Sequence, residues 1–137
     1  MKNEIIRELG GFVARHRYAR ISSRKARLIA DMIRGRNVND ALDLLKLQPQ
    51  RGAAFFEKVL LSAIANAAQD EEVDTNSLFV ADARADDGPM LNNRLRYRPG
   101  PQGRAMPYAK KTSHLTVIVA SAATIAASDE AEEGANA

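Results

Sequence analysis

The chain has 137 residues, of which 45% are hydrophobic and 5% aromatic, and it carries a formal net charge of +3 at pH 7. This length accommodates one compact domain with a core of Leu, Ile, Val and Ala, but not two domains of ordinary size. Cysteine is absent, which excludes disulfides and thiolate metal sites, and no apolar run reaches the ~18 to 20 residues of a membrane helix.

Positive charge is concentrated in two segments. Residues 14–36 hold eight basic side chains against one acidic, and residues 94–111 hold six against none, so the rest of the chain is acidic. Clustered Lys and Arg release counterions when they meet phosphates, and the planar guanidinium of Arg suits phosphate oxygens. The distribution therefore favours a polyanionic partner.

The N-terminal part is predicted to lead into a basic strand and then a helix. Residues 1–13 form an N-terminal extension without the features of an export or transit signal. From Gly11 to Ile21 apolar and basic residues partly alternate, which indicates an extended segment. Ser22 or Ser23 is placed to cap the following amphipathic helix, and Gly35 to end it.

The charged face of this helix has two interpretations. Arg24, Arg27, Asp31 and Arg34 share one face at helical spacing. They either bind the polyanion, in line with the basic strand before them, or form a solvated surface with an Arg27–Asp31 ion pair.

Two further helices are predicted before the acidic turn at residues 70–74. Asn39 is placed to cap a short helix, with Val38 packing back on it. Pro49 separates this helix from the next and fits the first turn of a longer one that runs to about Asp70. The longer helix keeps the 3.6-residue period of apolar side chains and is expected to be the central core helix.

Two strands and a long basic connection follow. Period-two alternation predicts a strand from Ser77 towards Ala85, and a strongly β-branched run predicts a second one at His114–Ala120. Between them, residues 86–111 are rich in Gly, Pro and basic residues and offer almost nothing to bury. The alternating arginines at 94, 96 and 98 and the turn cluster at 99–103 predict two extended arms folded at a tip. A hairpin of this kind is not stable alone in water and requires a partner.

The fold class is therefore predicted as α+β, with a small antiparallel sheet packed on three helices and a long protruding β-hairpin at about 83–116. Residues 14–122 are predicted to form a single RNA-binding domain. The last segment, 123–137, is rich in alanine and acidic residues and is predicted to be a flexible tail.

Catalytic chemistry is poorly represented. His16 and His114 are the two histidines, and Ser113 beside His114 does not make a triad, since adjacent residues of a strand point to opposite faces. RNA contact or strand packing suits both histidines better. No phosphate-binding glycine loop or calcium loop is present, so we expect no catalytic residue, no metal and no cofactor.

Two stretches resemble one protein family. Residues 16–36 read HRYARISSRKARLIADMIRGR, and residues 97–119 read YRPGPQGRAMPYAKKTSHLTVIV. Both are similar to the bacterial family of large-subunit ribosomal protein twenty-two, and NVNDALDLL and KVLLSAIANA at residues 37–45 and 58–67 match its intervening helices. The resemblance covers about residues 14–120.

The resemblance implies a structural, non-enzymatic protein of the cytoplasmic ribosome. It implies binding to large-subunit ribosomal RNA, a role in subunit assembly, and a hairpin that lines the polypeptide exit tunnel. Expected partners are this RNA, neighbouring large-subunit proteins and the nascent polypeptide, with no membrane and no small-molecule substrate.

Candidate site residues follow from the matching positions and the basic clusters. Those expected to contact RNA are Arg17, Arg20, Ser22, Ser23, Arg24, Lys25, Arg27, Arg34, Arg36, Arg94, Arg96, Arg98, Arg104, Lys110, Lys111, Thr112 and His114. The residues expected at the tunnel tip are Arg98, Pro99, Gly100, Pro101, Gln102, Gly103, Arg104, Ala105 and Met106.

The sequence departs from the family pattern in the arm. Gly100 and Pro101 stand where the family has a basic residue followed by a small one. The arm is about three residues longer between Gly88 and Tyr97, with Asn92 and Asn93 at positions that are often basic.

Two other function classes are compatible with parts of the sequence. An architectural DNA-binding protein can also carry arginine-rich β-arms with a proline-containing tip, but such proteins normally dimerise, and no further apolar face is evident. An RNA-modifying enzyme would require site residues that the sequence does not offer.

Overall fold

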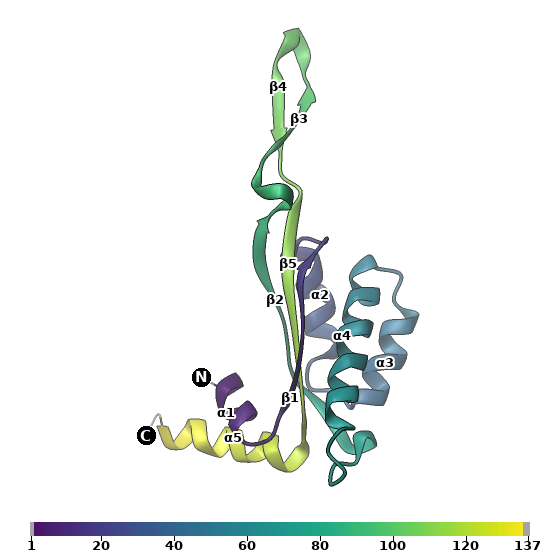
Figure 1. Cartoon of the computed structure of the whole chain (residues 1–137), viewed down its shortest axis with the longest axis vertical. Helices are drawn as coiled ribbons and strands as arrows, with labels where there is room; N and C mark the ends of the chain where they lie inside the picture. Colours follow the sequence, from purple (N-terminus) through teal and green to yellow (C-terminus); the bar gives the residue numbers. More distant parts are fainter. Residues whose placement is uncertain (1, 136–137) are drawn as a thin grey trace.

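The computed structural model describes residues 2–135 and has the predicted α+β architecture (Figure 1). The order of elements places three helices between the first and second strands and one helix at each end. The elements are α1 (Lys2–Glu8), β1 (Phe12–Ala19), α2 (Ser23–Ile33), α3 (Val38–Leu47), α4 (Arg51–Ala67), β2 (Leu78–Met90), β3 (Arg96–Pro99), β4 (Ala105–Tyr108), β5 (Lys111–Ser121) and α5 (Ala122–Ala135).

The body is built on an antiparallel three-stranded sheet in the order β1-β5-β2. The central strand β5 pairs Val117 with Ala14 of β1 on one side and with Ala83 of β2 on the other. Because β5 is covered on both faces, its side chains are buried continuously from Leu115 to Ala120. This explains why its β-branched run lacks the alternation of a half-exposed strand.

Helices α2, α3 and α4 lie on one side of the sheet and enclose the main core (Figure 1). Phe56 and Leu60 of α4 are fully buried there with Ile29 of α2 and with Leu115 and Val117 of β5. These are the periodic apolar positions of the sequence, so burial of one stripe per helix accounts for the packing.

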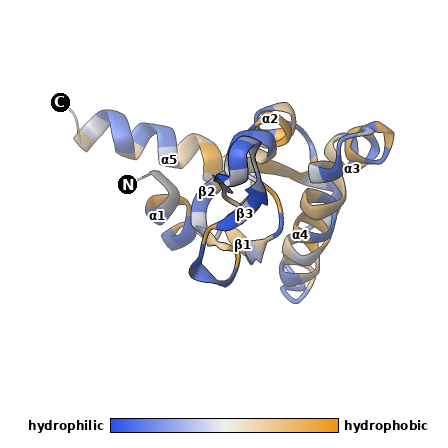
Figure 2. Cartoon of the chain, turned by 90° about the horizontal axis from the view of Figure 1, so that it is seen from above, coloured by the Kyte–Doolittle hydropathy of each residue, from blue (hydrophilic) through white to orange (hydrophobic). Residues whose placement is uncertain are grey.

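A second, smaller cluster lies outside this core. Ile6 of α1 is buried with Ile118 and Ala120 of β5, and Ile125 of α5 packs against them. The tail prediction is therefore wrong for residues 123–135, which belong to helix α5. The helix has few apolar side chains of its own, and its packed end supplies the contact that the composition did not reveal. Figure 2 shows its hydrophobic end beside the body and its hydrophilic end directed away.

Three element boundaries differ from the sequence prediction. The side chain of Asn37, not Asn39, caps α3 by accepting the N–H of Asn39. Pro49 precedes α4, which begins at Arg51 with Gln50 as its N-cap residue, so Pro49 is not in the first turn. Strand β2 continues past Ala85 to Met90, paired with β5.

The arm consists of two consecutive ladders joined by an irregular step. The lower ladder is the continuation of β2 and β5 and ends at the pair Met90–Lys111, and the upper ladder is β3 with β4. Between them, a 3-10 turn over Leu91–Asn93 holds Asn92 and Asn93 at φ values of 59° and 55°. Asparagine tolerates this left-handed region better than most residues, so Asn92 and Asn93 are suited to form the step. Figure 1 shows the upper ladder projecting well beyond the helices.

Candidate nucleic-acid interface

The upper ladder carries exposed arginines on a scaffold without an apolar core. Arg94, Arg98 and Arg104 are exposed and Arg96 is half-buried. Arg98 lies over the ring of Tyr108, with its guanidinium carbon 4.4 Å from the ring centroid. This cation–π contact spans the ladder and fixes the direction of one cation.

The tip is a short turn that closes the upper ladder after the pair Pro99–Ala105. Gln102 and Gly103 both have positive φ values, of 56° and 72°. The N–H of Gly100 donates to the carbonyl of Arg104 at 2.7 Å. A Cβ on Gly100 would lie 2.9 Å from that same carbonyl oxygen, so only glycine allows this closure. Gly100 and Pro101 are thus part of the turn.

A basic hollow lies on the sheet face opposite the helices. Arg15 and Arg17 of β1, Arg84 of β2 and His114 of β5 line a cavity of about 330 Å³ together with Tyr18. Asp86 also lines this hollow, and its carboxylate lies 3.7 Å from the buried Nε atom of Arg84, which within residues 2–135 makes no hydrogen bond. Cations thus line this face above the region where α1 and α5 cover it.

Tyr18 produces a break in the strand and leaves its ring exposed. Its φ is 58°, and the pairing of β1 with β5 shifts between His16 and Ala19. Its N–H donates to Nδ1 of His114 at 3.1 Å, and the two rings meet edge to face with centroids 4.9 Å apart. Left-handed backbone at a tyrosine costs roughly 1 to 2 kcal/mol. An exposed ring held in this way offers a stacking surface for a base.

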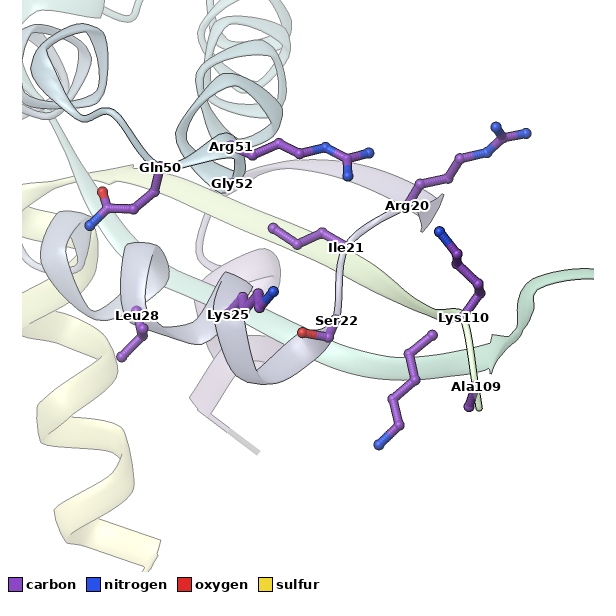
Figure 3. A pocket seen from close by; sticks show the side chains of 11 residues that line it. Arg20, Ile21, Ser22, Lys25, Leu28, Gln50, Arg51, Gly52, Ala109 and Lys110 are labelled. Carbon is purple, nitrogen blue, oxygen red and sulfur yellow. The ribbon is translucent and has the colours of Figure 1, made fainter. Parts of the chain in front are cut away.

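A second basic hollow lies at the base of the arm, between α2 and α4 (Figure 3). It brings together the predicted residues Arg20, Ser22, Lys25, Lys110 and Lys111, which come from β1's end, α2 and the start of β5. Arg24 is also exposed on α2.

Other side chains that were predicted to contact RNA form hydrogen bonds or ion pairs with residues of the chain itself. The Ser23 hydroxyl donates to Asp87 of β2. The Nε of Arg27 donates to the carbonyl of Ala85 at 3.1 Å, and its Nη2 lies 3.7 Å from Asp87. The hydrogen bond from Ser23 lowers the pKa of Asp87, with smaller effects from desolvation, which raises it, and from the charges of Arg27 and Lys111, which lower it.

Arg34 is likewise held, and the expected Arg27–Asp31 pair is replaced. Asp31 pairs with Arg34 at 2.8 Å, one turn later in the same helix. Arg34 also donates to the carbonyl of Ala83 at 2.5 Å and lies 3.5 Å from Asp82. Arg36 donates to the carbonyl of Met32 at 2.8 Å. The charged face of α2 therefore both holds the helix against β2 and exposes positive charge.

Thr112 is buried inside the lower ladder, where its hydroxyl donates to the carbonyl of Pro89 at 2.5 Å. A Cβ on Gly88 would lie 2.6 Å from this hydroxyl oxygen, so Gly88 makes room for it. Thr112 thus closes the two strands on each other, and its hydroxyl faces the hairpin.

Three basic residues of these hollows were missed by the sequence analysis as RNA contacts. Arg15 and Arg84 meet across β5, since both pair with Thr116. Arg51 stands at the start of α4, far from either basic segment. The alternation of β1 could have identified Arg15, but no local signal brings Arg51 or Arg84 to the basic surface.

Within residues 2–135, no group of three or more His, Cys, Asp or Glu side chains is arranged to hold a metal ion. No helix in this part of the chain combines the length and apolar character needed to cross a lipid bilayer.

The chain is similar to one family of known proteins. The family described as ribosomal protein L22p/L17e matches residues 14–120. The large ribosomal subunit protein uL22 of Caldicellulosiruptor saccharolyticus is 48% identical over 103 residues, which cover 75% of this chain and 82% of that protein. The uL22 proteins of Lacticaseibacillus casei and Ligilactobacillus salivarius are 48% and 47% identical over 73% of this chain, and 83% and 84% of their own lengths are covered.

The matched region runs from within β1 to the last but one residue of β5 and contains both basic hollows and the whole arm, whereas α1 and α5 lie outside it. On the match over most of its length and the similarity to these relatives, the chain belongs to the ribosomal protein L22p/L17e family.

Proposed function

We propose that the chain is a structural component of the large ribosomal subunit, that it binds large-subunit ribosomal RNA through its basic hollows and arm, and that the tip lines the polypeptide exit tunnel. The family is structural and non-enzymatic and belongs to the cytoplasmic ribosome, so the function is one of binding and assembly. The relatives carry the name of a large-subunit protein.

The observation that carries the RNA-binding part of this proposal is the isolated upper ladder. Two paired strands of four residues each project without a covering element, and the residues around them are exposed. A lone two-stranded ribbon is marginal in water, and this one carries basic side chains with no acidic residue from 94 to 111. A polyanion supplies both the missing contacts and the counter-charge.

The division of contacts supports structured RNA as the polyanion. The exposed arginines suit phosphates, which position a protein, while Tyr18 and the amides of Asn92 and Asn93 offer stacking and hydrogen bonds to unpaired bases. Neighbouring ribosomal proteins are further partners, and the nascent polypeptide is the expected neighbour of the tip.

The experiment that tests subunit membership is sedimentation of a native lysate on a sucrose gradient. Stoichiometric co-migration with the large subunit after a salt wash is the expected result. A free pool of the 15.0 kDa protein, or a stable dimer that binds duplex DNA at physiological salt, would instead support the DNA-binding alternative.

Neutralising the arm tests RNA binding directly. Replacing Arg94, Arg96 and Arg98 by Gln should weaken binding to a large-subunit RNA transcript and reduce the slope of log affinity against log salt by about 2, at ~0.7 per lost contact. The control is Lys46→Gln with Lys58→Gln on α3 and α4, which removes two positive charges from residues outside the arm and both basic hollows. Equal slopes for the arm variant and the wild-type protein would contradict the proposal.

A further inference from the structure

The hollow at the base of the arm brings together five basic side chains from separate parts of the sequence (Figure 3). Its volume is about 500 Å³, and no carboxylate is among the residues that line it. The basic residues are Arg20, Lys25, Arg51, Lys110 and Lys111. Such a concentration of like charge around one cavity is unfavourable unless an anion occupies it.

Four of these cations form no ion pair with the described residues of the chain. Within residues 2–135, the ion pairs of the structure involve none of Arg20, Lys25, Arg51 and Lys110. Lys111 is the exception, since its charge acts on Asp87, which is already held by Ser23 and Arg27. The acidic side chains of the described residues therefore do not neutralise the hollow, which stays strongly positive.

The side chain of Arg51 is oriented by a contact within its own helix. Its guanidinium carbon lies 5.7 Å from the centroid of the Phe55 ring, one turn later in α4. The Phe55 ring in turn meets the His16 ring of β1 edge to face, with centroids 5.6 Å apart. These contacts stabilise one direction for a long side chain that is otherwise exposed and reduce the entropy lost when it binds.

The backbone at the two helix starts reinforces this positive character. Helices α2 and α4 both begin at the hollow, and neither has a side-chain cap or an acidic residue in its first turn. Helix α3, which begins elsewhere, has both an Asn37 cap and Asp40. Gly52 permits the close approach, because a Cβ there would lie 3.1 Å from Cδ1 of Ile21.

We propose that this hollow is a phosphate-binding site that holds a backbone phosphate of the large-subunit RNA, with Arg51 as an anchoring residue alongside Lys25 and Lys110. This assignment rests on the proposed function and adds to it a defined ligand group and a residue outside both basic segments. Arg51 can form two parallel hydrogen bonds to phosphate oxygens, while the lysines supply compact charges from the facing segments.

The first test uses inorganic phosphate and needs no RNA. Phosphate is titrated into the ¹⁵N-labelled full chain at constant ionic strength, with chloride as the reference anion. The amide signals of Ser23, Arg24, Gly52 and Ala53 should shift together and saturably. Arg51→Ala should weaken this response, while Lys58→Ala, on the same face of α4 two turns later, should leave it unchanged. Absence of a saturable response, or equal responses in all three proteins, would overturn the site.

The second test identifies the RNA phosphate by ethylation interference. Wild type and Lys58→Ala should give the same set of phosphates whose ethylation blocks binding, and Arg51→Ala should lose at least one of them. Its affinity should fall by about tenfold, the effect of one lost charge-assisted contact. An Arg51→Lys variant keeps the charge and should recover part of the loss.

An unchanged interference set for Arg51→Ala would overturn the phosphate site while the intact protein still binds RNA. Failure of the wild-type protein to bind RNA at all would count against the proposed function instead, and the phosphate titration would still decide whether the hollow binds the anion.

Discussion

Ser23, at the start of α2, donates its hydroxyl hydrogen bond to Asp87 of β2, a residue 64 positions later in the chain. Arg27 lies on the other side of the same carboxylate. The contact fastens the helix to the strand from which the arm rises, and it thereby sets the position of the basic helix relative to the arm.

This contact predicts a dependence of stability on acid. The fold lowers the pKa of Asp87 below its ordinary 3.8, so the ionised carboxylate stabilises the folded state. The contribution is complete above that value and is lost as the pH falls through the lowered pKa. Thermal unfolding followed from neutral pH to about pH 2 should show a lower Tm for Asp87→Asn at neutral pH and a shrinking difference in acid.

The control for this experiment is Asp86→Asn, which changes the adjacent carboxylate beside Arg84. A constant difference in Tm between Asp87→Asn and wild type at every pH would show that the contact does not depend on ionisation.

Arg34 and Arg24 should separate structural from RNA-binding arginines on α2. Arg34 contacts Asp31, Asp82 and the carbonyl of Ala83, so Arg34→Ala should lower the free energy of unfolding by about 1 kcal/mol. Arg24 is exposed, and Arg24→Ala should change stability by less than about 0.5 kcal/mol while weakening RNA binding. Urea denaturation and a transcript-binding assay measure the two effects, and the reverse order of stabilities would contradict the assignment.

The sequence predicted those elements in which local pattern and tertiary packing agree. Helix α4 was found because one apolar period runs through it, and strand β5 because of its continuous β-branched run. Helix α5 was missed because its burial depends on Ile125 meeting Ile6 and Ile118, residues far away in the chain. Its composition, which is that of a flexible segment, does not reveal this contact.

The sequence predicted which segments are basic, but not which of their side chains are held by other residues or which distant residues join them. Clustered arginines marked the arm and α2 correctly as basic surfaces. Which of them remain available depends on partners such as Asp87 and the Ala83 carbonyl, which the sheet brings to the helix. Arg51 joins the surface because α4 starts beside α2, where Gly52 packs closely against Ile21 and Ile29. Neither fact has a local signature.

The packing of α1 on the sheet should contribute measurably to stability, although α1 lies outside the region that matches the family. Ile6 is 1% exposed and packs with Ile118 and Ala120. Ile6→Ala should lower the free energy of unfolding by about 2 kcal/mol or more, through lost burial and a residual cavity. The neighbouring Leu9 is 44% exposed, so Leu9→Ala serves as the control and should have a small effect. Equal losses in urea denaturation would mean that α1 does not pack on the sheet in solution.

The tip should affect nascent peptides more than assembly. Residues 100–104 close the upper ladder after the pair Pro99–Ala105, so replacing them with Asn-Gly should keep the ladder paired while shortening the tip. This variant removes Arg104, one of the expected RNA contacts, but keeps the arginines at 94, 96 and 98 and both basic hollows, so incorporation into large subunits should be largely retained. Because the proposed position of the tip is the tunnel wall, sensitivity to tunnel-binding antibiotics or stalling by arrest peptides should change.

Ribosomes carrying the variant as their sole copy would be compared with wild type by gradient sedimentation and by toeprinting on an arrest sequence. Normal sedimentation with altered stalling would support the tunnel position, whereas normal sedimentation with identical stalling and drug response would place the tip away from the nascent chain.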